Sequence, residues 1–337
     1  MKIAIHKKNS GFSKRWIEYC SENGIPFKLV DCYQNDIIEY ISDCDGLMWH
    51  FHQSEPKDIL FAKQLIFSLH AAGIRVFPDF YTSWHFNDKV GQKYLLEAID
   101  APLVPSYVFY SQDKALKWVK NTSFPKVLKL RSGAGSTNVR LVEDAATAKK
   151  CIYKAFKLGF RQYDPVLNFK ERWRKYRLGK TEWTDMVKAF IRLGYRPKFD
   201  RIAGREKGYI YFQDFIPGNK HDIRINIIDG KASGARRKVR KNDFRASGSG
   251  LFDFDTSKVP VEALKISFQI AEKLKLQTVA FDFILDNDNP VIVEMSYGFG
   301  QTEFHTGYWD SDLNYYEGEF NPFGWMVESF IREIESN

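Results

Sequence analysis

The stretch FDFILDNDNPVIVEMSYGFG, residues 281–300, contains two apolar runs joined by a polar turn, which predicts a β-hairpin. Each run carries one acid, Asp282 on the first and Glu294 on the second. With the turn centred on Asp288, the two acids lie directly opposite each other. Opposed Cβ atoms of an antiparallel pair are about 4.5–5.5 Å apart, where like charges repel. The acids therefore need a cation between them, a shared proton or free solvent, and Ser296 points to the same face.

Taken by itself, the hairpin is consistent with either a metal site or solvated edge carboxylates. A second loop, RSGAGSTN at residues 131–138, lies between two predicted strands, with Lys129 at the end of the first. Its glycines and serines allow backbone N–H groups to converge on an anion, although an ordinary hairpin turn is the alternative. Because magnesium is usually held by one or two carboxylates plus substrate phosphates, a phosphate loop favours the metal interpretation of the hairpin.

The segment HDIRINIIDGKASGARRKVRKNDFRASGSG, residues 221–250, supplies candidate anion-binding arginines. Strand alternation places Asp222 and Arg224 on one face of HDIRI. Guanidinium groups donate paired hydrogen bonds to phosphate or carboxylate, which suits the charge that develops in phosphoryl transfer. A solvated basic strand is the alternative. Three of the arginines that follow in the segment are further candidates, Arg236, Arg237 and Arg245.

The first hundred residues alternate between strand and helix patterns. Strand patterns occur at 2–5, 26–32, 45–51 and 75–79, with helical patterns between them. This alternation predicts a parallel, Rossmann-like sheet covered on both faces. No G-x-G-x-x-G follows the first strand, so the dinucleotide-binding fingerprint is absent. The periodicity further predicts one continuous helix over residues 82–99.

The composition is that of a soluble globular protein. Of 337 residues, 44% are hydrophobic and 27% are charged. No apolar run approaches the roughly 18 residues of a membrane span, and the N-terminus lacks the pattern of a signal peptide. The four cysteines show no C-x-x-C spacing, so we expect reduced thiols and a cytoplasmic protein.

The net charge of +8 is concentrated in one segment, residues 157–208, which holds fifteen Lys/Arg and six Asp/Glu, a local charge of +9. One interpretation is a solvated helical elaboration or a homo-oligomer contact. The other is a lid or docking surface for an anionic substrate, such as a nucleotide-sugar, an acidic polymer or the phosphopantetheine of a carrier. Nothing resembles a known nucleic-acid module, so nucleic acid is not expected. The residues that would bind phosphate or stack are Arg172, Trp173, Arg174, Lys175, Tyr176 and Arg177.

In this order, the motifs resemble the ATP-grasp superfamily, most closely the branch that contains ribosomal-protein S6 glutamate ligase and glutathione synthetase. The resemblance covers nearly the whole chain except 157–208 and the extreme C-terminus. Besides the hairpin, it is carried by NDKVGQKYLLEAIDAPLVPSY (87–107), FPKVLKLRSGAGSTNVRLV (124–142), YFQDFIPGNKHDIRI (211–225) and ARRKVRKNDFRASGSG (235–250).

The resemblance implies an α/β protein with the ATP-grasp fold. An N-terminal Rossmann-like pre-grasp domain would span residues 1–104. Two α+β subdomains that enclose ATP would follow, an N-terminal one at 105–208, which includes the basic insertion at 157–208, and a C-terminal one at 209–337.

The resemblance also implies the site residues. The nucleotide would be bound by Lys89, Lys129, Gly133, Gly135, Ser136, Thr137, Gln213, Asp214, Phe215, Ile216 and Asp222. Magnesium would be bound by Asp282, Glu294 and Ser296, and the reacting groups would be stabilised by Arg224, Arg236, Arg237 and Arg245. Ser296 stands where the family places Asn, and Ser247 likewise replaces an expected Asn.

The implied activity is ATP-dependent ligation of a carboxylate to an amine or thiol through an acylphosphate, with ATP and Mg²⁺, or Mn²⁺ in its place. The expected substrates are a small-molecule or carrier-bound acid and amine, which no motif in the chain identifies. One alternative is an ATP-grasp kinase that phosphorylates a small-molecule or sugar hydroxyl. The other is a nucleotide-binding protein without catalysis, an alternative that the serine at 296 raises.

Overall fold

The computed structural model describes residues 1–53, 55–133, 138–177, 179, 181–194, 198–240, 243–300 and 306–336. The chain forms two compact units. Unit 1 comprises Met1–Phe86, Leu96–Pro102 and Gly218–Asn337, and unit 2 comprises Asn87–Leu95 and Leu103–Pro217. Among the described helices, none is both long and apolar enough to cross a membrane.

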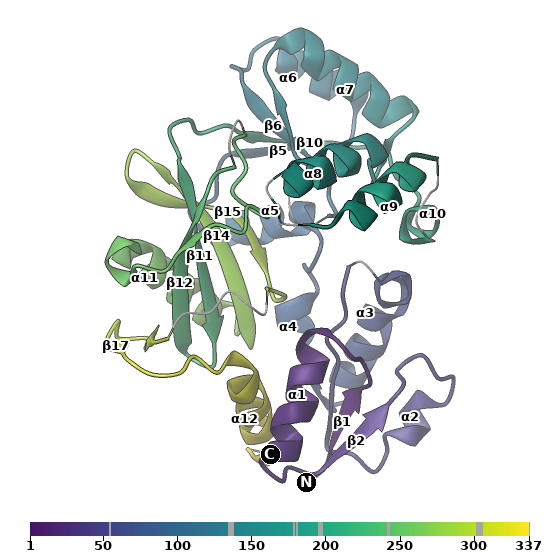
Figure 1. Ribbon diagram of the computed structural model, residues 1–337, viewed down its shortest axis with the longest axis vertical. Coiled ribbons are helices and arrows are strands. Elements are labelled where there is room, and N and C mark those ends of the chain that lie inside the picture. Colours follow the sequence, from purple (N-terminus) through teal and green to yellow (C-terminus); the bar gives the residue numbers. More distant parts are fainter. Residues whose placement is uncertain are drawn as a thin grey trace. The chain divides into compact units, whose positions relative to one another are not determined.

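Unit 1 begins with a parallel sheet in the strand order β2-β1-β3-β4, as predicted (Figure 1). Its strands are β1 (Ile3–His6), β2 (Phe27–Val30), β3 (Gly46–Met48) and β4 (Arg75–Phe77). The helices between and after them are α1 (Gly11–Glu22), α2 (Ile37–Tyr40), α3 (Pro56–Ala71) and α4 (Phe80–Ser83).

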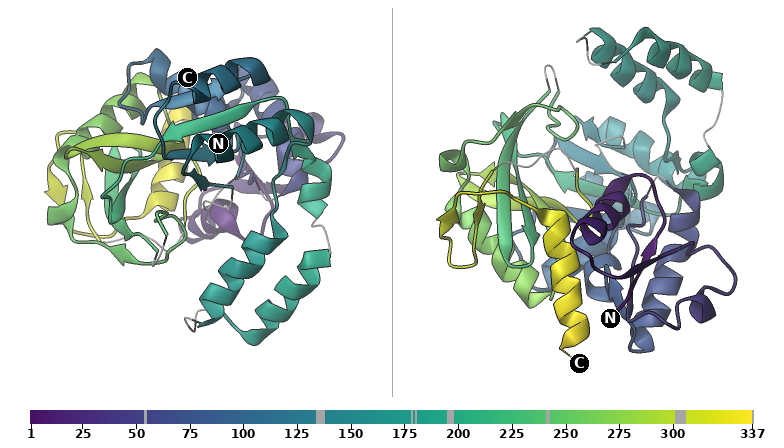
Figure 2. Two further views of the ribbon diagram at one scale, coloured as in Figure 1. Left: turned by 90° about the horizontal axis from the view of Figure 1, so that it is seen from above. Right: turned by 60° about the horizontal axis from the view of Figure 1, so that its bottom comes forward.

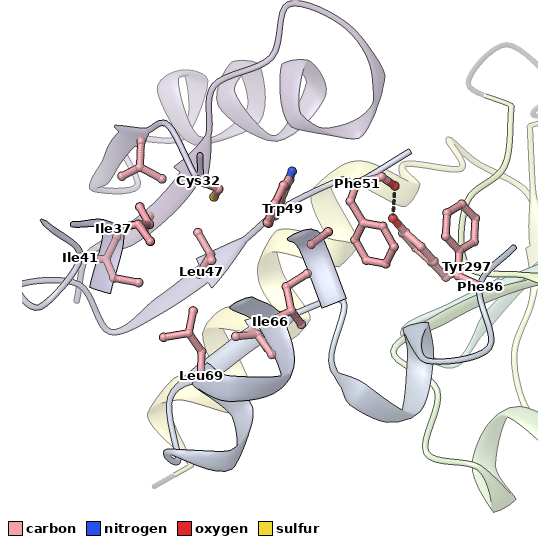
Figure 3. Close-up of a cluster of buried hydrophobic side chains, with 14 residues drawn as sticks. Cys32, Ile37, Ile41, Leu47, Trp49, Phe51, Ile66, Leu69, Phe86 and Tyr297 are labelled. Carbon is pink, nitrogen blue, oxygen red and sulfur yellow. Dashed lines mark hydrogen bonds between the residues drawn. The ribbon is translucent and has the colours of Figure 1, made fainter. Parts of the chain in front are cut away.

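Both faces of this sheet are covered by apolar side chains. On one face, Leu47 and Trp49 pack with Ile66 and Leu69 of α3, and Figure 3 shows this cluster reaching Tyr297. The other face packs against α1 and against the C-terminal helix α12 (Pro322–Glu335), which lies beside α1 in Figure 1. The contact with α12 is close, because a Cβ added at Gly46 would lie 2.7 Å from Cζ of Phe330.

The prediction of one continuous helix over 82–99 was wrong. The chain forms α4 and then α5 (Lys89–Ala98), with residues 84–88 between them. Asn87 has a φ of 57°, in the left-handed region that ends a helix. The Asp88 carboxylate then accepts from the N–H of Gly91 at 2.9 Å and so caps the start of α5. A turn signal, Asn-Asp, therefore outweighed the apolar periodicity.

The remainder of unit 1 is an antiparallel sheet with the path β15-β14-β11-β12-β16-β17, and β13 also pairs with β12. Helix α11 (Val261–Lys273) packs against β11, β14 and β15. The strands are β11 (His221–Ile228), β12 (Lys231–Lys238), β13 (Phe252–Asp253), β14 (Thr278–Asp286), β15 (Asn289–Ser296), β16 (Tyr308–Trp309) and β17 (Tyr315–Tyr316), with a 3₁₀ turn at Thr256–Lys258.

Unit 2 is built on an antiparallel sheet in the order β5-β10-β6-β7. The strands are β5 (Ser106–Phe109), β6 (Lys126–Lys129), β7 (Arg140–Val142) and β10 (Ile210–Asp214). Helices α6 (Gln112–Val119) and α7 (Ala145–Lys157) cover one face, where Leu128 and Phe212 pack against Ala148 and Ile152. The opposite face carries Lys129 and Gln213, since side chains alternate along a strand.

The basic insertion starts and ends in a two-stranded stem, β8 (Phe160–Arg161) paired with β9 (Arg205–Glu206). Its interior is helical, as predicted, with α8 (Pro165–Arg177), α9 (Trp183–Gly194) and α10 (Lys198–Ala203). Helices α8 and α9 lie side by side (Figures 1 and 2), and an ion pair of 3.0 Å between Arg172 and Asp185 joins them.

Candidate functional site

The opposed acids of the hairpin are confirmed, but by a different turn from the one predicted. Asn287 and Asp288, with φ angles of 48° and 66°, form a two-residue turn that pairs Asp286 with Asn289. That turn alone would place Asp282 opposite residue 293. A bulge after Asp282 shifts the register by one residue, so Asp282 pairs with Glu294.

Asp282 belongs to a network of alternating charges on one face of the sheet. Arg224 on β11 donates to it from Nε at 2.8 Å and from Nη2 at 3.0 Å. Arg237 on β12 lies between the two aspartates, 2.9 Å from Asp282 and 2.5 Å from Asp222. Strand pairing explains the arrangement, because Asp222 is opposite Arg237 and Arg224 is opposite Asp282. Four predicted site residues therefore lie together.

Burial makes these charges interdependent. Burial raises the pKa of Asp282, but the positive charges of Arg224 and Arg237 outweigh it and hold that pKa below the ordinary range of an aspartate. Burial lowers the pKa of Arg237, and the charges of Asp282 and Asp222 reverse this and raise it. Asp282 and Arg237 are therefore both ionised at neutral pH, and the cations that face Asp282 in the structure are guanidinium groups.

The remaining predicted metal ligands are next to Asp282 in the pairing register. Glu294 is directly opposite, and Ser296 is opposite Ala280, one pair further along the same face. The Ser296 hydroxyl donates to the carbonyl of Gly298 at 2.8 Å. Two carboxylates and a hydroxyl are the hard oxygen donors that Mg²⁺ prefers, so the residues present fit that ion. Among the described residues, no group of three or more His, Cys, Asp or Glu side chains is arranged to hold a metal.

Two of the predicted arginines lie away from this network. Arg236 alternates to the opposite face of β12, where its Nη2 is 2.7 Å from Nδ1 of His221. Arg245 lies in the loop after β12, and its guanidinium binds the carboxylate of Asp243, at 2.7 Å from Nη2. The structure therefore places Arg237, rather than Arg236, beside Arg224.

In unit 2, a hydrogen-bonded chain crosses the sheet face that carries Lys129. Its Nζ donates to Oε1 of Gln213 at 2.5 Å, and Nε2 of Gln213 donates to Oγ of Ser106 at 3.0 Å. The hydroxyl of Tyr211 also binds Ser106, at 3.1 Å. Lys129 and Gln213 are 5% and 2% exposed, so these two predicted nucleotide-binding residues form a buried polar pair.

The other predicted residues of the adenine hinge do not share the sheet face of Gln213. Asp214 points toward the helices, where its carboxylate accepts from Nζ of Lys126 at 2.5 Å. That ammonium lies 5.2 Å from the centre of the Tyr107 ring. Phe215 and Ile216 follow the end of β10 and are half-buried.

The first residues of the glycine-serine loop are fixed by the turn that precedes α5. Lys89 is 6% exposed, and its Nζ donates to the carbonyl of Gly133 at 2.6 Å. The N–H of Gly133 in turn donates to Oδ1 of Asn87 at 2.7 Å, and Arg131 lies 3.3 Å from Asp88. The structure thus brings two predicted residues, Lys89 and Gly133, into contact. Three others, Gly135, Ser136 and Thr137, lie outside the described residues.

An acid that the sequence did not single out binds the same loop. Glu206 on β9 accepts from the backbone N–H of Arg131 at 3.0 Å and from that of Ser132 at 3.2 Å. The hydroxyls of Ser132 and Tyr209 also donate to it. Two N–H groups at the start of the loop therefore converge on an internal carboxylate, and their convergence on a phosphate stays a prediction.

Ser106, Asn87 and Glu206 are among the residues of these groups that sequence reasoning missed. Only Asn87 carried a local signal, since it directly precedes Asp88 and Lys89 in the stretch 87–107 that carries the resemblance. Ser106 binds Gln213, and Glu206 binds the N–H groups of Arg131 and Ser132, all more than 70 residues away in the chain. No local pattern reveals such contacts.

The candidate docking residues of the insertion lie on α8. Trp173 and Tyr176 are 48% and 43% exposed, and Arg177 is also exposed. The ring of Trp173 stacks on that of Phe169, with centroids 6.4 Å apart. Arg172 instead joins α8 to α9 through Asp185, which is a structural role.

Comparison with known proteins identifies the fold. Residues 199–311 match the model of the RimK-like ATP-grasp domain family. The curated proteins include no match to this chain.

Solved structures match over the whole chain. A D-alanine–D-alanine ligase from Bacillus anthracis, complexed with ATP, has a TM-score of 0.58 and 14% identity, with 100% of this chain and 99% of that chain covered. A RimK domain ATP-grasp protein from Sphaerobacter thermophilus has a TM-score of 0.53 and 14% identity, over 98% and 100%. The ATP-grasp ligase PsnB, complexed with minimal precursor, Mg and ADP, has a TM-score of 0.54 and 10% identity, over 99% and 98%. At these identities the likeness is one of fold.

Proposed function

We propose that this chain is an ATP-dependent ligase that joins a carboxylate to an amine or thiol. The match of residues 199–311 to the RimK-like ATP-grasp domain supports the proposal, and it confirms the resemblance predicted from the sequence. One observation carries the proposal. Two guanidinium groups, Arg224 and Arg237, are held on a single sheet face by aspartates, with Glu294 opposite one of those aspartates. Such a face holds oriented guanidinium donors beside a further carboxylate, an arrangement that suits the charge that develops in phosphoryl transfer to an acid.

In the first step, an oxygen of the substrate carboxylate attacks the γ-phosphorus of ATP. The bond between that phosphorus and the β-phosphate oxygen breaks, ADP leaves, and the acid becomes an acylphosphate. Arg224 and Arg237 stabilise the negative charge on the transferred group, because their orientation is fixed before the substrates bind. The aspartates that pair with them supply this orientation.

In the second step, the nitrogen of the amine, or the sulfur of a thiol, attacks the acyl carbon. The carbon–oxygen bond to phosphate breaks, inorganic phosphate leaves, and the nucleophile gives its proton to solvent. Activation is needed because a free carboxylate is a poor electrophile, whereas phosphate is a good leaving group. The chain contributes mainly position and charge, which are the effects that dominate phosphoryl transfer.

The nucleotide and metal roles are assigned to separate groups of residues. Lys89 and Lys129 would bind phosphates, and the backbone after Gln213 would bind the adenine. Asp282 and Glu294 would hold Mg²⁺, with Ser296 as a hydroxyl ligand. The ion would supply neutralisation of the charge on the ATP phosphates.

The test is a screen for ADP release. The full chain is incubated with ATP, Mg²⁺ and pairs drawn from amino acids, sugar acids, nucleotide-sugars and amines, and the products are weighed by mass spectrometry. We expect ADP release that requires both an acid and an amine or thiol, with a product heavier than the acid by the nucleophile minus water. A product that instead carries a phosphate ester would identify the kinase alternative. ADP release that stays at background with every pair would leave only nucleotide binding.

A further inference from the structure

A cavity of about 260 Å³ opens in unit 2, behind the sheet face that carries Lys129. Its floor is apolar and includes Leu128, Leu130 and Phe160, which are 2%, 6% and 5% exposed. Leu128 and Leu130 alternate with Lys129 along the chain, so they line the side covered by α7. The volume lies just below the about 300–1,000 Å³ of pockets for drug-sized ligands, and it suits a small molecule.

The rim of this cavity is strongly basic. Asp164 is the acid that lines it, and that carboxylate is paired with Arg140 at 2.8 Å. Among the described residues, no carboxylate pairs with Lys154 or Arg161. Four cations and one acid give the lining a net charge of +3. The four cations are Arg140 on β7, Lys154 on α7, Arg161 on β8 and Arg205 on β9.

Two of these four cations also face each other across the stem, where their like charges repel. Arg161 and Arg205 are direct partners across β8 and β9, a position at which like charges destabilise a strand pair. Arg205 donates to the carbonyls of Leu158 and Gly159, at 3.3 and 3.0 Å, which orients its guanidinium but does not neutralise it. Lys154 lies 5.0 Å from the centre of the Phe160 ring, a contact that also leaves the charge in place.

We propose that this cavity is a binding site for a small phosphate-bearing anion, separate from the residues assigned to ATP. Guanidinium groups match the oxygens of phosphate, and an anion at the rim would relieve the repulsion between Arg161 and Arg205. The apolar floor formed by Leu128, Leu130 and Phe160 would take an apolar part of the same ligand.

The site also lies next to the glycine-serine loop. Asn138, which lines the cavity, follows that loop in the chain, and Arg205 precedes Glu206, whose carboxylate binds the start of the loop. An anion that stabilises the stem therefore also stabilises the position of Glu206. On the proposed function, an occupied site lowers the KM for ATP.

The test is isothermal titration calorimetry of the full chain at constant ionic strength, with inorganic phosphate and with phenyl phosphate. Arg161→Gln removes one charged donor, so we expect a rise of about tenfold in the dissociation constant. In Arg161→Gln/Arg205→Gln, we expect no detectable binding. Two exposed lysines outside the cavity give matched controls, and Lys150→Gln and Lys207→Gln should stay within about twofold of the parent protein.

A further variant, Lys129→Met, separates this site from the proposed nucleotide site and should retain the binding. Tighter binding of phenyl phosphate would identify an organic phosphate as the occupant, and equal binding would identify free phosphate. The proposal is overturned if neither compound binds, if the arginine variants bind as well as the controls, or if Lys129→Met alone removes the binding. Because calorimetry needs no turnover, failure of the proposed ligase activity would not affect this result.

Discussion

Asp282 accepts hydrogen bonds from two guanidinium groups, and this determines what its removal would do. Asparagine keeps the shape of the side chain but removes the negative charge that pairs with both Arg224 and Arg237. Breaking a buried ion pair in this way costs about 3–5 kcal/mol. We therefore expect Asp282→Asn to lower the free energy of unfolding by about 3 kcal/mol in urea titrations. A change below about 1 kcal/mol, typical of exposed pairs, would contradict the buried network.

Glu294 and Ser296 separate the metal proposal from the structural role of Asp282. Glu294→Gln keeps the size of the side chain but removes a charged ligand, so we expect loss of turnover. Ser296→Asn introduces the amide that the family places at this position, and it should preserve or raise turnover. Steady-state ADP release at several Mg²⁺ concentrations measures both variants. Loss of activity in Ser296→Asn would show that the hydroxyl has a role of its own.

The predictability of the site differs from residue to residue. The opposition of Asp282 and Glu294 was predicted from a turn centred on Asp288. It arises instead from a two-residue turn and a bulge, and the bulge could not be predicted because it depends on local backbone geometry. The partners of Asp282 come from β11 and β12, and the pairing of β11 with β14 joins residues 58 apart in the chain. The sequence shows which residues are charged, but it does not show which strands pair with one another.

Among the elements, the stem β8–β9 connects the basic insertion to the glycine-serine loop through Glu206. Glu206→Gln would place an amide N–H₂ against a set of donors, so the loop would lose at least one charge-assisted hydrogen bond. We expect the KM for ATP to rise about tenfold, with a smaller change in kcat. The exposed Glu182 on the insertion gives a control, and Glu182→Gln should behave as the parent protein. An unchanged KM in Glu206→Gln would exclude a positioning role.

Helix boundaries show a second limit of sequence reasoning at this scale. The apolar residues of α4 and α5 have the same helical spacing, and this spacing continues across the turn between them. It therefore predicted one helix over 82–99. The Asn-Asp pair at 87–88 carried the contrary signal. The helical content of the insertion was predictable from composition, whereas the opposition of Arg161 and Arg205 became visible only in the stem.

At the scale of the molecule, the C-terminal helix α12 is part of the core of the N-terminal sheet. Phe330 is fully buried there, in a cluster with Ile3, Met48 and Phe77. Phe330→Ala removes this ring and leaves a cavity, which costs about 3–5 kcal/mol. We expect a correspondingly lower urea midpoint and faster hydrogen exchange in β1 and β3. If exchange accelerated in α12 alone, the helix would not be part of that core.

Buried histidines give the same sheet a dependence on pH. Burial lowers the pKa of His6 and of His50, so both bind a proton less readily in the folded chain than in the unfolded chain. Below about pH 6.5 the unfolded chain binds protons that the folded chain does not, and stability falls as pH falls. Each histidine contributes at most about 1.4 kcal/mol per pH unit.

We therefore expect the opening free energy of β1 and β3, measured by hydrogen exchange, to fall between pH 7 and pH 5. In His50→Gln the opening free energy should fall less steeply with pH, because one of the two histidines no longer contributes. This difference in slope does not depend on the absolute stability of the variant. An equal slope in the variant would show that His50 is not responsible.

The packing of α12 against β1 also has a consequence for the timing of biosynthesis. Roughly 320 residues separate the two elements, which a ribosome adds at about 5–20 per second, so β1 waits roughly 15–60 s for its covering helix. During that interval the apolar face formed by Ile3, Ile5 and Met48 is covered by α1 but not yet by α12. Unit 2, whose residues are all made before position 218, has no such delay. The order in which the two units mature is therefore the reverse of the order in which the chain begins them.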